Sequence, residues 1–276
     1  MKIQEEIITS RNNPKVKWAA SLSSKKGREE ERSFIAEGEK LTFEALEARL
    51  PVTNIFITES KKCNFFERLR EYNNADAYKN TEITVLSDSA FEKISTEKAP
   101  QGIISVIKYL DFFRDIGIIY KDEFFLDPEE RIIVLSSVRD PGNIGAVIRS
   151  AVAFGVDHIF ITADSADIYN PKTVRSAMGS LFRVKITVVG DVNSLLDALK
   201  SIGRRVFAAE LSDNARSLGE VGLLSSDAII IGNEGHGIAP EISSACTGSV
   251  YIPISKKTES LNASVAAAIF MWELSK

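Results

Sequence analysis

The sequence predicts an α/β protein whose second half folds around a mostly parallel sheet. From about residue 131 onward, apolar runs of strand length alternate with segments whose apolar residues recur at helical spacing. Strands separated by helices favour a parallel sheet covered on both faces. The chain has 276 residues, 44% of them hydrophobic and 26% charged, which suits a globular protein long enough for two domains.

The first half is predicted to be a smaller α/β unit. Apolar residues recur at helical spacing in residues 33–50, after a short extended start. Two further stretches, residues 64–73 and 88–95, also favour helices. Strand-like runs occur at residues 52–58, 83–87 and 102–109.

The second half alternates more regularly. We expect strands at residues 132–136, 158–162, 184–189, 206–210, 228–232 and 249–254. We expect helices to begin near Ile144, Lys172, Asn193 and Leu261. In sheets of this kind, ligands bind beyond the carboxyl ends of the strands.

Residues 111–130 differ from both halves. They are rich in aromatic and acidic residues, contain Pro128 and show no sustained period. We therefore predict a first domain over residues 1–110, a linker over residues 111–130 and a second domain over residues 131–276.

The composition excludes several classes of protein. The two cysteines lie far apart, and two histidines are too few for a His-rich metal site, so we expect no metal. The chain has no run of about 18 apolar residues and no apolar signal-peptide core at its start. We expect a cytoplasmic protein with no membrane segment.

The net charge is −4, but a basic arm lies near the N-terminus. It carries six basic residues and no acid between Ile8 and Arg28, with Trp18 among them. Such an arm can neutralise phosphates, and it can equally be the solvated face of a helix; charge alone leaves both readings open. The candidate RNA-binding residues are Arg11, Lys15, Lys17, Lys25, Lys26 and Arg28.

Three turns carry residues that could do chemistry. The first, DPGNIGAVIR, combines a Pro-Gly turn with Asn143 as an expected helix N-cap, followed by Arg149. The second, GNEGHG, holds three glycines in six residues, with Glu234 between two of them. It lacks the phosphate-loop pattern, and a carboxylate there suits a cationic ligand or one bound by backbone groups.

The third turn is a polar loop, SKKTES, between a strand and the last helix. Apolar residues recur at helical spacing from Leu261 to Trp272, and Ser260 and Asn262 could cap that helix. For each turn a purely structural role, a cap or a surface residue, stays open.

Taken together and in this order, the turns resemble the SpoU (TrmH) family of RNA ribose 2′-O-methyltransferases, in the SPOUT superfamily. The resemblance rests on DPGNIGAVIRSAVAFG, IIIGNEGHGI and IPISKKTESLNASVAAAI, with SAMGSLFRV between the first two. The first half is similar to the ribosomal-protein-like RNA-binding domain that often precedes the catalytic domain, through SRNNPKVKWAASL, RSFIAEGEKLTFEAL and PQGIISVI.

The resemblance implies an α/β catalytic domain with a C-terminal trefoil knot and S-adenosylmethionine as the cofactor. The positions expected at the cofactor are Leu211, Gly232, Glu234, Ile252 and Leu261. The glycines are then explained by close approach of the ligand to the backbone.

The resemblance also implies which residues act at the ribose 2′-hydroxyl. These are Arg149, Asn143, Glu234, Ser260 and Asn262. Arg149 has been cast as the general base in this family. Because a free guanidinium does not deprotonate near neutral pH, it could instead anchor a phosphate and stabilise the developing oxyanion.

Structured RNA is the expected partner, ribosomal more than transfer RNA, and the family is dimeric through its catalytic domain. Three alternatives remain: an inactive RNA-binding protein of the same fold, a transfer RNA ribose methyltransferase, and a related enzyme that methylates a base nitrogen. A nucleotide-dependent oxidoreductase is disfavoured because no strand is followed by G-x-G-x-x-G.

Overall fold

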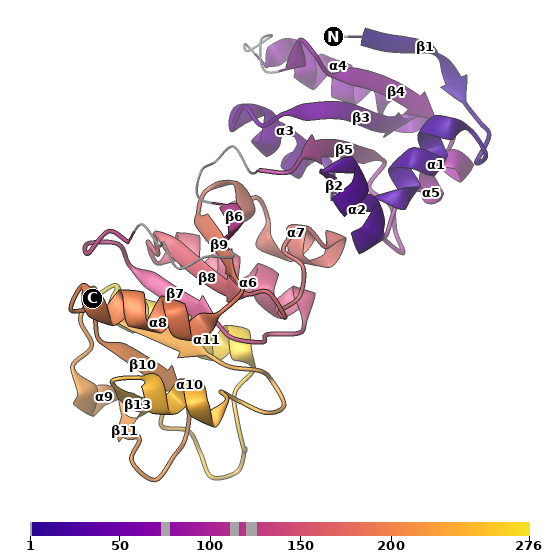
Figure 1. Cartoon of the computed structure of the whole chain (residues 1–276). Coiled ribbons are helices and arrows are strands. Elements are labelled where there is room, and N and C mark those ends of the chain that lie inside the picture. The colour runs from indigo at the N-terminus through magenta and orange to yellow at the C-terminus, as the bar shows by residue number, and fades with distance from the viewer. Residues whose placement is uncertain (1, 73–77, 111–115, 120–125) are drawn as a thin grey trace. The chain divides into compact units, whose positions relative to one another are not determined.

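The computed structural model describes residues 2–72, 78–110, 116–119 and 126–276, which form two compact units (Figure 1). Unit 1 comprises Met1–Leu110 together with Asp167–Phe182. Unit 2 comprises Asp111–Ala166 and Arg183–Lys276. None of the helices in the described ranges is both long and apolar enough to span a membrane.

Unit 1 contains a five-stranded mixed sheet in the order β1-β4-β3-β5-β2. Its strands are β1 (Lys2–Ile8), β2 (Ser33–Glu37), β3 (Val52–Thr58), β4 (Glu82–Leu86) and β5 (Ile103–Lys108). Strands β1, β4 and β3 run parallel, and β5 is antiparallel to both β3 and β2. The three predicted strands were placed correctly, whereas β1 was missed because its sequence, KIQEEII, has polar and charged residues between its apolar ones.

The helices of unit 1 are α1 (Pro14–Ser21), α2 (Lys25–Glu31), α3 (Glu39–Glu47), α4 (Lys62–Glu71), α5 (Asp88–Glu92) and α7 (Pro171–Ala177), with short 3-10 turns at Glu59–Lys61 and Ser180–Phe182. Helices α1 and α5 share one hydrophobic core with the sheet. Val16 and Leu22 of that core come from α1 and its C-cap, Phe91 from α5, and Phe56 from β3. The basic arm is therefore folded onto the domain through its apolar side.

One member of the basic arm is buried and does not face solvent. Arg28 is 1% exposed, and its Nε and Nη2 donate to Oδ2 of Asp167 at 3.1 and 2.5 Å. Its Nη1 donates to the backbone oxygens of Leu22 and Ser23, both at 2.9 Å. The prediction of Arg28 as an RNA-binding residue is wrong, because its guanidinium is already occupied inside unit 1.

The segment Asp167–Phe182 explains this pairing. It follows and precedes parts of unit 2 in the sequence, yet it packs within unit 1. The Tyr169 ring stacks on Phe34 and Tyr109 at centroid distances of 4.7 and 4.1 Å, and its hydroxyl accepts the Leu110 N–H at 2.9 Å. By contacts, unit 1 is therefore larger than the residues 1–110 expected from the sequence.

Unit 2 is built on an eight-stranded sheet in the order β11-β13-β10-β12-β7-β8-β9-β6, with every neighbouring pair parallel. Its strands are β6 (Ile116–Ile119), β7 (Ile132–Leu135), β8 (His158–Thr162), β9 (Lys185–Val189), β10 (Val206–Ala209), β11 (Arg216–Ser217), β12 (Ala228–Ile231) and β13 (Gly248–Tyr251). This confirms the predicted parallel sheet. Strand β6 falls in the expected linker; residues 111–115 and 120–125 of that linker lie outside the described residues.

The described residues of unit 2 also form the helices α6 (Pro141–Ala153), α8 (Val192–Ser201), α9 (Leu218–Val221), α10 (Pro240–Ala245) and α11 (Ala263–Leu274). Helices α8 and α10 bury Leu195, Leu199 and Ile242 against alternate residues of the central strands, such as Val134 and Ile230. Helices α6 and α11 pack against each other, and α11 also contacts β12. This pair of helices brings together the first and the third of the three predicted turns, which we now call the three motifs.

Candidate active site

The site lies where two neighbouring strands of unit 2 end. Strands β7 and β12 pair in register up to Leu135 and Ile231, and the Ser136 N–H donates to the Ile231 oxygen at 2.8 Å. The loop after β7 leads into α6, and the loop after β12 is the predicted glycine turn. The Asn233 Nδ2 donates to the Ser137 oxygen at 2.8 Å, which ties the two loops together. The carboxyl edge of the sheet was the expected place for a ligand.

Helix α6 begins earlier than expected, and this changes the role of Asn143. Asp140 is its N-cap, accepting the Asn143 N–H at 3.0 Å, and Pro141 occupies the first helical position. The prediction of Asn143 as the cap is therefore wrong. Because Asp140 supplies the cap, the Asn143 amide is left to bind elsewhere.

The Asn143 side chain joins the three motifs. Its Nδ2 donates to Oε1 of Glu234 at 2.8 Å, and its Oδ1 accepts the Nδ2 of Asn262 at 2.9 Å. Asn262 also caps α11, its Oδ1 accepting the N–H of Ser264 at 2.9 Å. The expected capping role of Asn262 is confirmed, and the other end of the same amide bonds Asn143; its role in the reaction stays a prediction.

The Glu234 carboxylate accepts two further hydrogen bonds from the start of the first motif and the residue before it. The backbone N–H groups of Arg139 and Asp140 donate to it at 3.1 and 3.2 Å. Partial burial raises the pKa of Glu234, but these bonds and the bond from the Asn143 amide outweigh it and hold that pKa below its ordinary value. Glu234 is therefore an ionised carboxylate held by three hydrogen-bond donors.

Arg139 and Asp164 form a second charged pair near Glu234, and the sequence patterns did not predict it. The Arg139 Nη2 pairs with Oδ2 of Asp164 at 2.9 Å, and the hydroxyls of Ser137 and Thr162 donate to the same carboxylate, each at 2.6 Å. Burial raises the pKa of Asp164, and these three donors lower it overall. Arg139 stands directly before the DPGN turn, and this position in the sequence could have marked it as a neighbour of the site.

The glycine turn closes on itself. Asn233 and Gly237 exchange backbone hydrogen bonds of 2.9 and 3.0 Å. A Cβ added to Gly232 would lie 2.5 Å from the carbonyl carbon and oxygen of Gly237, and Gly237 itself has a φ of +69°. The need for glycine at these two positions comes from the turn itself, whereas the sequence had suggested close approach of a ligand.

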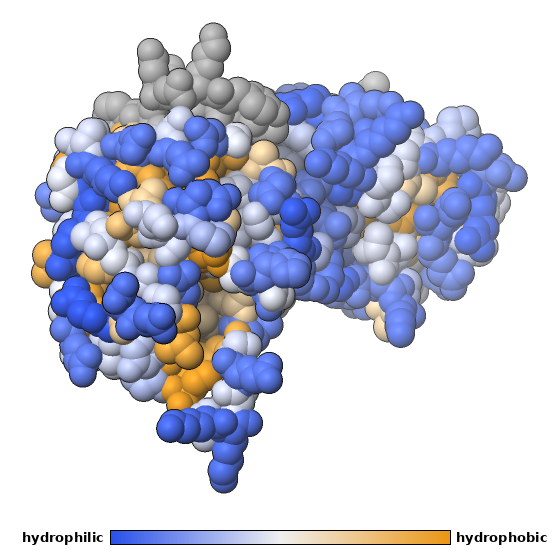
Figure 2. Space-filling view, turned by 60° about the horizontal axis from the view of Figure 1, so that its bottom comes forward, coloured by the Kyte–Doolittle hydropathy of each residue, from blue (hydrophilic) through white to orange (hydrophobic). Residues whose placement is uncertain are grey.

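A cavity of about 490 Å³ opens beside the third motif. Four of the predicted residues line it: Leu211, Ile252, Ser260 and Leu261. Gly232 and Glu234 are not in its lining. Leu211 is 80% exposed there, a large fraction for an apolar side chain. On the face shown in Figure 2, apolar residues come to the surface among hydrophilic ones.

Arg149 stands apart from these contacts. It lies on α6, is exposed, and forms no ion pair or side-chain hydrogen bond with any described residue. The structure therefore joins Asn143, Glu234 and Asn262 directly, but links Arg149 to them only through the helix it shares with Asn143. Its guanidinium is available to an incoming group.

The comparisons with known proteins agree with this geometry. Residues 130–272 match the SpoU rRNA Methylase family, and residues 13–105 match the MRM3-like substrate binding domain. The chain belongs to the SpoU rRNA methylase family.

Its relatives extend over nearly the whole chain. The 23S rRNA (guanosine(2553)-2′-O)-methyltransferase RlmP of Bacillus subtilis (strain 168) is 32% identical over 267 residues, which cover 97% of this chain and 98% of the relative. A crystal structure of an RNA 2′-O ribose methyltransferase superposes with a TM-score of 0.80 at 26% identity, covering 98% of both chains. An AdoMet-bound rRNA methyltransferase from Sinorhizobium meliloti has the same fold, with a TM-score of 0.79 at 24% identity over 99% of this chain and 97% of that one.

Membership of the SpoU family confirms the predicted enzyme class, an RNA ribose methyltransferase, and its cofactor, S-adenosylmethionine. The SPOUT fold class is likewise confirmed. The trefoil knot and the individual roles of the site residues stay predictions.

The cavity suits this cofactor on its own chemistry. Its volume falls in the range of small-molecule sites, and the chain from Ile252 to Leu261 borders it without regular secondary structure, so backbone groups are available for hydrogen bonds. Leu211 and Leu261 offer apolar surface for a purine ring. The Glu210 carboxylate, held by the hydroxyls of Ser243 and Ser249 at 2.5 and 2.7 Å, also lines the cavity. No group of three or more metal-ligating side chains occurs in the described part of the chain.

Proposed function

We propose that this SpoU-family chain methylates one ribose 2′-hydroxyl of 23S ribosomal RNA. The observation that carries the proposal is the hydrogen-bonded chain Asn262–Asn143–Glu234, which joins the three motifs next to the cavity at Ser260 and Leu261. The substrate is chosen because RlmP of Bacillus subtilis is a 23S rRNA 2′-O-methyltransferase and shares nearly the full length of this chain.

The cofactor is proposed to lie in the cavity between Leu211, Ile252 and Leu261. When bound there, S-adenosylmethionine would supply an electrophilic methyl group for the ribose oxygen, and its sulfur would keep the electron pair of the carbon–sulfur bond. The carboxylate of Glu210 complements a cationic ligand at one side of this cavity. The hydrogen bonds that join the three motifs are proposed to hold the reacting groups in a fixed orientation.

The proton of the 2′-hydroxyl is proposed to leave to water. Arg149 is a permanent cation and cannot accept it near neutral pH. Glu234 has a lowered pKa and is already engaged by three donors, which makes it a weak base. Arg149, exposed and unpaired within the described residues, instead anchors the neighbouring phosphate and stabilises the oxyanion as it forms.

Unit 1 is proposed to select the RNA. It carries the match to a substrate binding domain, and the reaction itself distinguishes RNA from DNA, because only RNA has a 2′-hydroxyl. A transfer RNA substrate, or binding without catalysis, are the alternatives that the experiment below separates. Because the proposed substrate is ribosomal RNA, the protein is proposed to act in the cytoplasm.

A second copy of this chain is proposed to pack on α11. Val265 and Trp272 are 47% and 50% exposed, and with half-buried Ile269 they form an apolar stripe at intervals of four and three residues. Exposed apolar stripes of this kind mark association surfaces. Light scattering of wild-type protein and of Trp272→Glu tests this: a dimer that becomes a monomer supports it, and a monomeric wild type contradicts it.

The experiment for the reaction is methyl transfer from labelled S-adenosylmethionine to total RNA from cells lacking the gene, followed by nucleoside analysis. A labelled 2′-O-methylnucleoside in 23S RNA supports the proposal, and its loss in Arg149→Ala with unchanged cofactor affinity supports the assigned role. Label in transfer RNA would change the substrate. Cofactor-independent RNA binding without label would favour the inactive alternative.

A further inference from the structure

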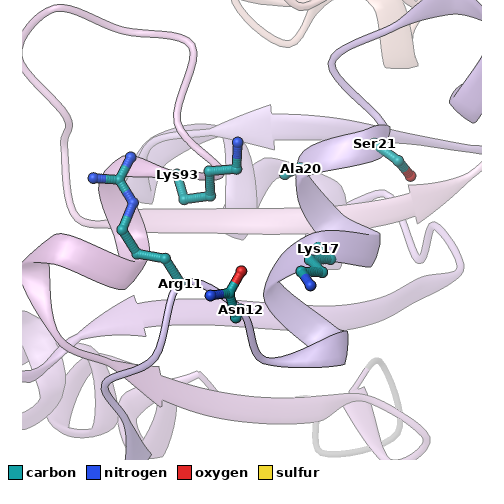
Figure 3. Close-up of a pocket in the computed structure, with 6 residues that line it drawn as sticks. All are labelled: Arg11, Asn12, Lys17, Ala20, Ser21 and Lys93. Carbon is teal, nitrogen blue, oxygen red and sulfur yellow. The ribbon is translucent and has the colours of Figure 1, made fainter.

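Unit 1 has a cationic pocket of about 540 Å³, well away in sequence from the catalytic motifs. It is lined by Arg11, Asn12, Lys17, Ala20, Ser21 and Lys93 (Figure 3). We call it the Arg11–Lys93 pocket. Three of the six lining residues are cations, and none is an acid.

Two elements that are distant in sequence build this pocket. In Figure 3, Lys17 and Ser21 project from α1, whereas Arg11 precedes that helix and Lys93 follows α5. The chain leaving β1 is fixed to the start of α5, because the Ser87 N–H donates to the Ile8 oxygen at 3.0 Å. The shared hydrophobic core of α1 and α5 then holds the two sides together.

The cations of the pocket differ from the rest of the basic arm. Lys15 pairs with Glu82 at 2.7 Å, and Arg28 is buried with Asp167. Lys25 and Lys26 pair along α2 with glutamates one turn on, at 3.8 and 3.7 Å; these are Glu29 and Glu30. By contrast, Arg11, Lys17 and Lys93 are exposed and have no acidic partner among the described residues.

Like charges around one concave surface repel each other and attract an anion. The Asn12 side chain adds a neutral hydrogen-bond donor, while the Ser21 hydroxyl already donates to the Trp18 oxygen at 2.7 Å. The lining has no aromatic side chain on which a base could stack. The chemistry therefore favours phosphate over a nucleobase.

We propose that the Arg11–Lys93 pocket binds backbone phosphates of the substrate RNA. This proposal rests on the proposed function, which supplies the substrate RNA. It deepens that function by naming where the protein contacts the RNA phosphates. It adds Lys93, which lies outside the basic arm, and it gives Lys25, Lys26 and Arg28 little or no part. Contacts of this kind fix the register of the RNA without reading its sequence.

The test compares two double variants of the full chain, Lys17→Ala with Lys93→Ala and Lys25→Ala with Lys26→Ala. Each removes two exposed lysines, but only the first pair lines the pocket. Binding of protein-free 23S ribosomal RNA is measured over a series of salt concentrations, with melting temperature and cofactor affinity as controls for folding. Arg11→Ala provides a second, independent variant.

The pocket variant should bind the RNA on the order of tenfold more weakly, and its salt slope should fall by roughly 1.5, because each phosphate contact contributes about 0.7–0.9. The Lys25/Lys26 variant should lose much less, since its lysines lie outside the pocket and each has a glutamate one turn on that offsets its charge. Equal losses in the two variants, or an unchanged slope in the pocket variant, would overturn the proposal.

A free phosphate ion is the other source of this chemistry. Calorimetry with inorganic phosphate separates the two: phosphate binding that disappears in the pocket variant while RNA affinity is unchanged would also overturn the proposal. Methyl transfer is measured on the same preparations. Pocket-dependent RNA binding by a wild type that transfers no methyl group would support the pocket and contradict only the proposed reaction.

Discussion

The amide of Asn143 donates to Oε1 of Glu234 at 2.8 Å, across 91 positions of sequence. The same amide accepts from Asn262, so a single side chain joins the starts of α6 and α11 to the loop after β12. Removing the Asn143 side chain takes one donor from Oε1 of Glu234 and the acceptor from Nδ2 of Asn262. The geometry of the whole site therefore depends on this residue.

For Asn143→Ala we expect methyl transfer to fall about a hundredfold, because misplacement of reacting groups by about an ångström costs that much. Cofactor affinity should change little, since Asn143 does not line the cavity. Single-turnover kinetics and equilibrium cofactor binding measure the two effects. Wild-type turnover in this variant would remove the hydrogen-bonded chain from the mechanism.

The lowered pKa of Glu234 makes a prediction about acid stability. Its carboxylate stays ionised in the folded protein at pH values where the unfolded chain begins to take up a proton. This stabilisation is present above the ordinary pKa of a glutamate, about 4.3, and is lost as pH falls through the lowered value. The free energy of unfolding should therefore decline less steeply in acid for Glu234→Gln than for wild type. Identical slopes would contradict the hydrogen bonding described for this carboxylate.

Glycine is required at position 232 but not at position 235. Gly232→Ala places a Cβ 2.5 Å from backbone atoms of Gly237, whereas the nearest atom to a Cβ at Gly235 is Oδ1 of Asn233 at 3.5 Å. We expect Gly232→Ala to lower the free energy of unfolding by about 1–3 kcal/mol and to abolish transfer, with Gly235→Ala close to wild type. Urea denaturation of the pair measures this. Equal stability of the two variants would show that the turn can rearrange.

The Arg28–Asp167 pair predicts a stability effect where the sequence had suggested RNA binding. Breaking a buried ion pair by removing one partner costs about 3–5 kcal/mol. Arg28→Ala should therefore destabilise unit 1 strongly, and Arg28→Lys should recover only part of the loss because one ammonium cannot replace the two nitrogens that donate to Oδ2 of Asp167. A stable Arg28→Ala protein that binds RNA poorly would restore the original interpretation.

Local patterns were enough to predict most of the secondary structure. The strand at residues 52–58 was predicted with its observed bounds because its apolar residues and its boundary at Pro51 are both local signals. Helix α6 was expected too late because Asp140 and Asn143 are both good caps, and only the structure shows which one accepts a backbone N–H.

Long-range pairings were beyond the sequence. Arg28 was misassigned because its partner lies 139 positions away, and Lys93 was missed because it reaches the pocket from another helix. The site residues were grouped through a family resemblance, not through spacing. Only the fold shows that Asn143 and Asn262, 119 positions apart, are hydrogen-bonded neighbours.

The joined motifs are proposed to form a working ribose methyltransferase that acts on 23S ribosomal RNA. The most direct test maps 2′-O-methylation of ribosomal RNA in cells with and without the gene, and in deleted cells carrying either the wild-type gene or Asn143→Ala. The account predicts one 23S position that loses its methyl group on deletion and regains it only with the wild-type gene. Identical methylation maps in all four strains would contradict it.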